Sequence, residues 1–130
     1  AWDAKKVDAA IQEIFGTNAT SEGKVKLKAP DIAENGAVIP ITVSSKLAGS
    51  KVAIFQDANP ESTVAVFTVP KGGVIDYSIR IKMAKTGNVT AVVEEGGKLY
   101  SASKEVKVTK GGCGGWFSSI TTHYIKLNKY

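Results

Sequence analysis

The chain has 130 residues, of which 43% are hydrophobic and 22% charged, the size and composition of one globular domain, so a second sizeable domain and a disordered chain are both excluded. Its net charge is +5, yet 16 of the 17 basic residues are scattered lysines and Arg80 is the only arginine. Since arginine is the usual reader of bases and phosphates, we expect no nucleic-acid binding; such a surface suits small anions or acidic proteins.

Membrane insertion is not expected either. No apolar run approaches the roughly 18–20 residues that span a bilayer, and the first six residues lack the apolar centre of a secretion signal. We therefore expect a soluble chain, either cytosolic or already processed. One cysteine and one histidine exclude an internal disulfide and a zinc site built by this chain alone.

The first predicted element is an amphipathic helix over residues 3–15. Its apolar positions recur at steps of three and four: Val7, Ala10, Ile11, Ile14 and Phe15. Asp3 is placed to cap the start of the helix, and Gly16 is placed to cap its end. The small polar residues 17–23 predict a loop.

Strands are predicted from Lys24 onward, where the apolar period changes to two. The seven predicted strands are 24–29, 39–43, 51–55, 63–69, 75–83, 89–93 and 99–108. Pro40 places its strand at a sheet edge or a bulge, and residues 56–62 and 95–98 read as turns. Short strands after one helix predict an all-β fold, an immunoglobulin-like antiparallel β-sandwich of about seven strands with one N-terminal helix, over residues 1–109.

The only cysteine lies among four glycines after the last strand. Glycines bring no side chains to pack and favour no regular structure, so residues 110–115 predict a flexible arm rather than core. This arm consists of Lys110, Gly111, Gly112, Cys113, Gly114 and Gly115. Five extended residues reach roughly 16–18 Å, enough to deliver a thiol into a channel of another protein. Lys107 and Lys110 would favour the thiolate. An engineered linker with a labelling cysteine is the alternative.

Residues 107–115 resemble the carboxyl-terminal arm of the SoxY family, the sulfur carriers of the bacterial thiosulfate-oxidising Sox complex. Residues 23–43 and 79–86 are similar to strands of that family, and the likeness covers about residues 1–115. The resemblance implies an immunoglobulin-like carrier, not an enzyme, that works in the periplasm after export. It also implies that Cys113 holds the substrate covalently while successive enzymes act on it.

The same resemblance implies the partners. A SoxZ-like subunit would form a heterodimer with this chain. A c-type haem SoxXA-like enzyme would couple thiosulfate to the thiol, a manganese SoxB-like hydrolase would release sulfate, and a sulfur dehydrogenase would act in those systems that have one. Haem and manganese would belong to these enzymes, and we expect no cofactor, metal site or catalytic residue in this chain.

Residues 116–130 depart from the family pattern. We interpret them as an artificial extension introduced by cloning. The alternative is a native strand or docking segment, because the stretch is rich in β-forming residues; the arm would then be an internal loop. His123 lies ten residues from Cys113, but no motif supports it as a base, and an exposed tail histidine is the preferred interpretation.

Two other functions are compatible with the residues alone. A β-sandwich binding or adhesion module could use Cys113 only for an intermolecular disulfide, and a carrier could also form such a disulfide homodimer. A thiol-redox enzyme is the third possibility, but the chain has no second cysteine to resolve an oxidised thiol.

Overall fold

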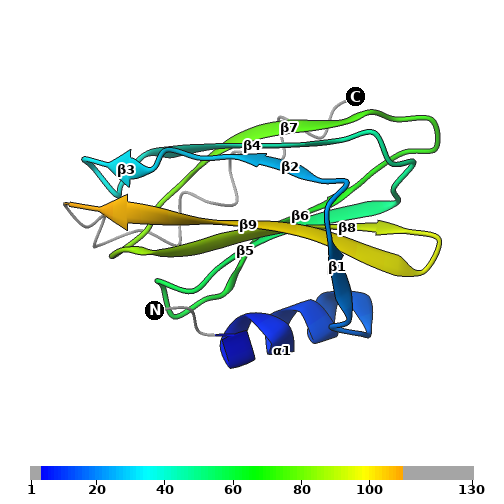
Figure 1. Cartoon of the computed structure of the whole chain (residues 1–130), viewed down its shortest axis with the longest axis horizontal. Helices are drawn as coiled ribbons and strands as arrows, with labels where there is room; N and C mark the ends of the chain where they lie inside the picture. The colour runs from blue at the N-terminus through cyan, green and yellow to red at the C-terminus, as the bar shows by residue number, and fades with distance from the viewer. Residues whose placement is uncertain (1–3, 110–130) are drawn as a thin grey trace.

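The computed structural model describes residues 4–109, which form two facing sheets and one helix (Figure 1). The predicted immunoglobulin-like β-sandwich with an N-terminal helix is confirmed. All seven predicted strands are present, and two short ones are added. In chain order the elements are α1 (Ala4–Phe15), β1 (Thr20–Glu22), β2 (Lys26–Lys28), β3 (Ile32–Ala33), β4 (Ile39–Ser45), β5 (Lys51–Gln56), β6 (Thr63–Thr68), β7 (Ile75–Ile81), β8 (Gly87–Glu95) and β9 (Lys98–Val108).

The larger sheet has six strands and the smaller sheet has three. The larger runs β1-β9-β8-β5-β6, with β3 also paired to β9, and the smaller runs β2-β4-β7. Every pair is antiparallel except β1 with β9 and β3 with β9, which are parallel. The antiparallel prediction is therefore right for the seven expected strands and does not extend to the two short ones.

The prediction of a loop over residues 17–23 was wrong for residues 20–22, which form β1. Thr20 to Glu22 pair with Leu99 to Ser101 of β9. All three residues of β1 are exposed, so no alternation of apolar and polar residues marks them as a strand. The segment is a strand because the free edge of β9 supplies its backbone hydrogen-bond partners, and its own side chains give no sign of this pairing.

Prolines end the pairing between β2 and β4. Lys28 is the last residue of β2 and lies opposite Thr42. Continuing this register would place Pro30 opposite Pro40, and neither has an N–H to donate. Pro40 is paired with Arg80 of β7 on the other side of β4. The prediction that Pro40 places its strand at a sheet edge or a bulge is therefore wrong, because β4 is the central strand of its sheet and pairs without a bulge. Pro40 is tolerated there because β2 pairs with β4 only as far as Thr42.

Apolar side chains from both sheets form the main core. The largest fully buried members of this cluster are Phe67, Ile39, Ile41, Ile54, Ile75, Ile81 and Met83. Tyr77 joins them, and burial raises the pKa of its hydroxyl above the ordinary value of 10.0. The outer face of β7 is wet, because Asp76, Ser78 and Arg80 are exposed.

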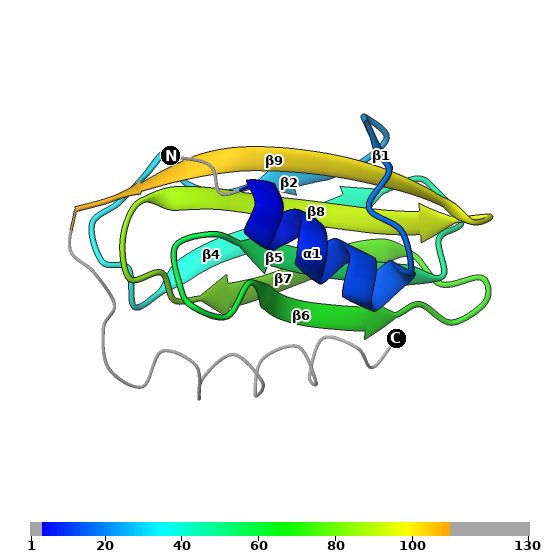
Figure 2. The same ribbon diagram turned by 90° about the horizontal axis from the view of Figure 1, so that it is seen from below.

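The helix forms a third layer. It lies across the outer face of the larger sheet (Figure 2), where Val7 and Ile11 are buried against β5, β8 and β9. Gly16 ends α1 with φ +79°, and its N–H donates to the Gln12 carbonyl over 2.8 Å. This is the left-handed cap that the sequence predicts. No helix within residues 4–109 is long and apolar enough to cross a membrane.

Candidate functional site

Most of the predicted site lies outside the described residues. Cys113, Lys110 and the four glycines Gly111, Gly112, Gly114 and Gly115 all follow residue 109, and so do residues 116–130 with His123. The proposed limits of the arm and of the extension stay predictions. Lys107 is described, and it lies exposed near the end of β9. The described residues therefore end directly before the predicted arm.

The end of β9 extends beyond its partner β8. The last pair between the two strands is Gly87 with Val106. Residues 107–109 are instead flanked by β3, which lies beside the end of β9 in Figure 1. We refer to residues 107–109, β3 and Thr86 together as the arm base.

Backbone hydrogen bonds tie the arm base on its β3 side. The Lys107 N–H donates to the Asp31 carbonyl over 3.0 Å, and the Thr109 N–H donates to the Ala33 carbonyl over 3.1 Å. The Thr109 hydroxyl adds longer contacts of 3.5 Å to the same carbonyl and 3.4 Å to that of Glu34. Thr109 is thus fixed four residues before Cys113.

A side chain ties the arm base on the opposite side. The Val108 N–H donates to the Thr86 hydroxyl over 2.9 Å. Thr86 itself is exposed and lies in the bend between β7 and β8. Its hydroxyl occupies the side on which β8 no longer supplies a backbone acceptor.

An ion pair lies beside these bonds. The Lys104 ammonium and the Asp31 carboxylate are 2.9 Å apart. The hydrogen bond from Lys104, then its charge, and to a smaller extent the charge of Lys107, hold the pKa of the Asp31 carboxyl below its ordinary value of 3.8. Lys107, predicted to favour a thiolate on Cys113, therefore also interacts with an acid on the folded domain.

Two buried side-chain amides, those of Gln56 and Asn59, hold the loops at this end of the sandwich through hydrogen bonds to the backbone. The sequence analysis did not identify them. Residues 56–62 read as turns, but Gln56 is the fully buried last residue of β5. Its amide oxygen accepts from the Ala58 and Asn59 N–H groups, both over 2.7 Å. A buried amide within a Pro- and Asp-containing segment has no distinct sequence pattern.

Asn59 extends this network to the bend that carries Thr86. Only 2% of Asn59 is exposed; its amide donates to the Lys82 carbonyl and accepts from the Ala84 N–H, both over 2.8 Å. On the other side of Thr86, the Asn88 N–H donates to the Asp57 carboxylate over 2.7 Å. The bend is therefore held before and after Thr86.

The other end of the sandwich carries a shallow groove of about 660 Å³ between residues 45–50 and 69–75. Lys46 and Lys71 are the titratable residues in its lining. Within residues 4–109, no three His, Cys, Asp or Glu side chains are grouped so that they could hold a metal ion.

The comparisons with known proteins agree on one family. A family model described as sulfur oxidation protein SoxY matches residues 11–113, from within α1 to the cysteine. The solved structure of the sulfur carrier protein SoxY from Chlorobium limicola f thiosulfatophilum is 45% identical to this chain. That match covers 82% of this chain and 99% of the other, with a TM-score of 0.76.

A more distant structure shows the same fold alone. The superoxide reductase (neelaredoxin) from Ignicoccus hospitalis is 17% identical, over 66% of this chain and 80% of its own, with a TM-score of 0.60. No curated protein sequence matches this chain.

Proposed function

Since the chain belongs to the SoxY family of sulfur oxidation proteins, we propose that it is a sulfur carrier which holds thiosulfate-derived intermediates covalently on Cys113. The expectation of a carrier rather than an enzyme is confirmed by this membership. The observation that carries the proposal is the family match itself, which runs through the whole sandwich and ends at Cys113.

The position of Thr109, the last described residue, suits this role. Thr109 is bonded to the folded domain, and Cys113 follows it four positions later. Fully extended, these four residue steps span roughly 13–14 Å. A thiol at that distance from a folded domain can enter a narrow channel while the domain stays outside.

The chemistry on Cys113 would proceed in balanced steps. The thiolate and thiosulfate form an S–S bond and lose two electrons, which pass to the haem of a SoxXA-like enzyme. Water then cleaves the bond between the outer sulfur and the sulfonate group at a manganese SoxB-like hydrolase. This releases sulfate and two protons and leaves a persulfide on Cys113. A sulfur dehydrogenase oxidises the remaining sulfur where the system has one.

The carrier contributes the thiolate and its delivery, and its partners contribute the metals. The positive charges of Lys107 and Lys110 would favour the thiolate over the thiol. A SoxZ-like subunit would complete a heterodimer in the periplasm. Covalent attachment keeps reactive sulfur species from escaping between successive enzymes.

Mass spectrometry of the protein from cells that oxidise thiosulfate tests the proposal. We expect thiosulfate-derived adducts on Cys113 that a reducing agent removes. A chain with Cys113→Ser from the same cells is the matched control and should carry none. Unmodified Cys113 during sustained thiosulfate oxidation with the complete set of partner enzymes would overturn the proposal.

A further inference from the structure

The last residues of β9 extend beyond the end of β8, yet hydrogen bonds hold them on both sides. Strand residues beyond their last partner ordinarily fray, and β8 pairs no further than Val106. Residues 107–109 nevertheless receive three backbone contacts, two to the carbonyls of the β3 segment and one to the Thr86 hydroxyl. The two sides of the overhanging strand are thus both occupied.

The β3 segment contributes little to the core. It has two residues, and Ile32 is 58% exposed while Ala33 is buried. Its strand contacts are with the end of β9, in the register of Ile32 with Lys107 and Ala33 with Val108. The Asp31–Lys104 ion pair reinforces the same contact. Since so little apolar surface is buried, packing alone does not account for this strand.

Hydrogen bonds on both sides of Thr86 fix its position. The bend that carries it is fixed by Asn59 on one side and by Asp57 on the other. Its own side chain is exposed, so its hydroxyl is not needed to fill the core. The bond to Val108 is the contact that its hydroxyl makes on β9.

We propose that β3 and Thr86 form a clip that sets the pivot of the Cys113 arm at Thr109, and that the clip thereby limits how far the thiol reaches. Thr86 is in this view a positioning residue for sulfur transfer. The inference rests on the proposed function, in which Cys113 is the site of attachment, and it adds the element that fixes the length of the arm.

The clip changes the reach substantially. With Thr109 fixed, four residues lead to Cys113 and span at most about 14 Å. With the clip open, the arm begins after Val106, and seven residues span up to about 25 Å. Because effective concentration falls with the −3/2 power of tether length, the longer arm would present its thiol at roughly half the local concentration.

An intramolecular disulfide can report the reach. Ala102 and Thr109 are about 23 Å apart along β9, at roughly 3.3 Å per residue. A disulfide tolerates at most about 7 Å between Cα atoms, so Cys113 on a clipped arm falls short of a cysteine introduced by Ala102→Cys. A cysteine introduced by Glu105→Cys, about 13 Å from Thr109, is within reach whether the clip is closed or open.

The experiment measures disulfide formation in the full chain, with oxidised glutathione as the oxidant, by non-reducing electrophoresis and mass spectrometry. With an intact clip, the Glu105→Cys variant should form the disulfide with Cys113 and the Ala102→Cys variant should form it far more slowly. Adding Thr86→Val should raise the Ala102→Cys rate about fivefold, the effect of one lost hydrogen bond on local opening. The Glu105→Cys rate should change by less than about twofold.

Thr42→Val is the matched control. The Thr42 hydroxyl pairs with that of Ser78 at 3.0 Å on the smaller sheet, so its loss should leave both rates unchanged. Amide exchange of Lys107 and Thr109 should rise with Thr86→Val in parallel with the Ala102→Cys rate. Asp31→Asn, which retains the backbone acceptor, should raise both readouts about twofold.

Equal disulfide rates at Ala102→Cys and Glu105→Cys with the clip intact would overturn the inference. An Ala102→Cys rate that Thr86→Val leaves unchanged, in a variant whose thermal unfolding shows it to be folded, would also overturn it. None of these readouts involves thiosulfate. A chain that passes them but is never loaded on Cys113 would disprove the carrier role and leave the clip standing.

Discussion

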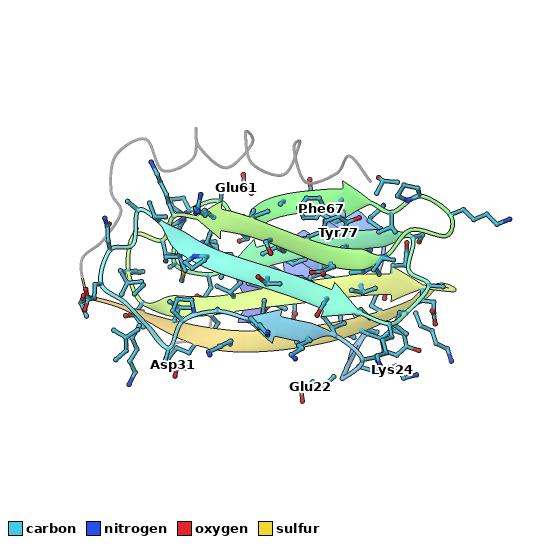
Figure 3. The ribbon with its side chains drawn as sticks, turned by 90° about the horizontal axis from the view of Figure 1, so that it is seen from above. Glu22, Lys24, Asp31, Glu61, Phe67 and Tyr77 are labelled. Carbon is cyan, nitrogen blue, oxygen red and sulfur yellow. The ribbon has the colours of Figure 1, made fainter. Side chains whose placement is uncertain are left out.

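The rings of Phe67 and Tyr77 are stacked, with centroids 4.5 Å apart and planes inclined by 8°. Phe67 belongs to β6 of the larger sheet and Tyr77 to β7 of the smaller sheet (Figure 3). The pair therefore joins the two layers on the side of the sandwich that β6 and β7 border. We expect this contact to be a large contributor to stability.

Phe67→Ala should lower the free energy of unfolding by about 3–5 kcal/mol, the usual cost of removing a fully buried aromatic ring. Chemical denaturation with urea measures this change. Phe15→Ala is the control, because Phe15 is only partly buried at the end of α1 and should cost about 1–2 kcal/mol. Equal losses for the two variants would contradict the assignment of Phe67 to the core.

Gln56→Leu should destabilise the domain although it replaces a polar residue with an apolar one. The substitution leaves the buried Ala58 and Asn59 N–H groups without their acceptor, at about 1–3 kcal/mol for an unsatisfied group. Urea denaturation should show the loss. The exposed Gln12 provides the control, since Gln12→Leu should change stability by no more than about 0.5 kcal/mol. A neutral Gln56→Leu would show that the amide is dispensable.

The Asp31 carboxyl should titrate below 3.8, because Lys104 stabilises its charged form. A lowered pKa in the folded state means that Asp31 favours folding above its unfolded pKa and loses this contribution as pH falls through its folded pKa. NMR titration of the carboxyl measures the value directly. Lys104→Met should move it toward 3.8, whereas Lys98→Met, at the opposite end of β9, should not. An Asp31 that titrates normally beside Lys104 would refute the ion pair.

Charge near the arm should control the reactivity of Cys113. Replacing Lys107 and Lys110 by Gln should slow alkylation by iodoacetamide at neutral pH by about twofold or less, because exposed charges are screened by solvent and salt. Lys46→Gln, at the other end of the sandwich, is the control for the loss of one positive charge. If the rate of the double variant equals that of the unchanged chain, neither lysine favours the thiolate.

Cys113→Ser should abolish sulfur loading and leave the thermal unfolding temperature unchanged, since the two core clusters of the described domain are built from residues that precede Cys113. Thiosulfate-dependent electron transfer with the partner enzymes measures the first effect, and calorimetry measures the second. The same variant separates the carrier from a module that only dimerises through a disulfide. In the latter case Cys113→Ser would change the oligomeric state and have no effect on thiosulfate oxidation.

Much of the fold was predictable because the layers leave different patterns in the sequence. β7 alternates strictly, since one face is core and the other is wet. β5 instead has a continuous buried run from Val52 to Gln56, because α1 covers one of its faces and the smaller sheet covers the other. The apolar run is visible in the sequence and indicates a strand buried on both faces, but the sequence does not tell which layer covers each face of β5.

The two short strands were not predictable. β1 has no buried residue and β3 has one, so both depend on the free edge of β9 rather than on their own side chains. The arm base was missed for the same reason, because the role of Thr86 follows only from its approach to Val108. Cys113 and its glycines, in contrast, stand out in the sequence and lie outside the described residues.

The pairing of β9 also constrains the order in which the domain can assemble. Thr20 pairs with a residue 79 positions later, and Ile32 with one 75 positions later. During synthesis these early segments must wait for the last described strand, and until then β8 has an open edge that can pair with other chains. Such long-range pairings also slow folding, typically to milliseconds or seconds. A chaperone that shields β8 until β9 arrives would therefore improve the yield of folded protein.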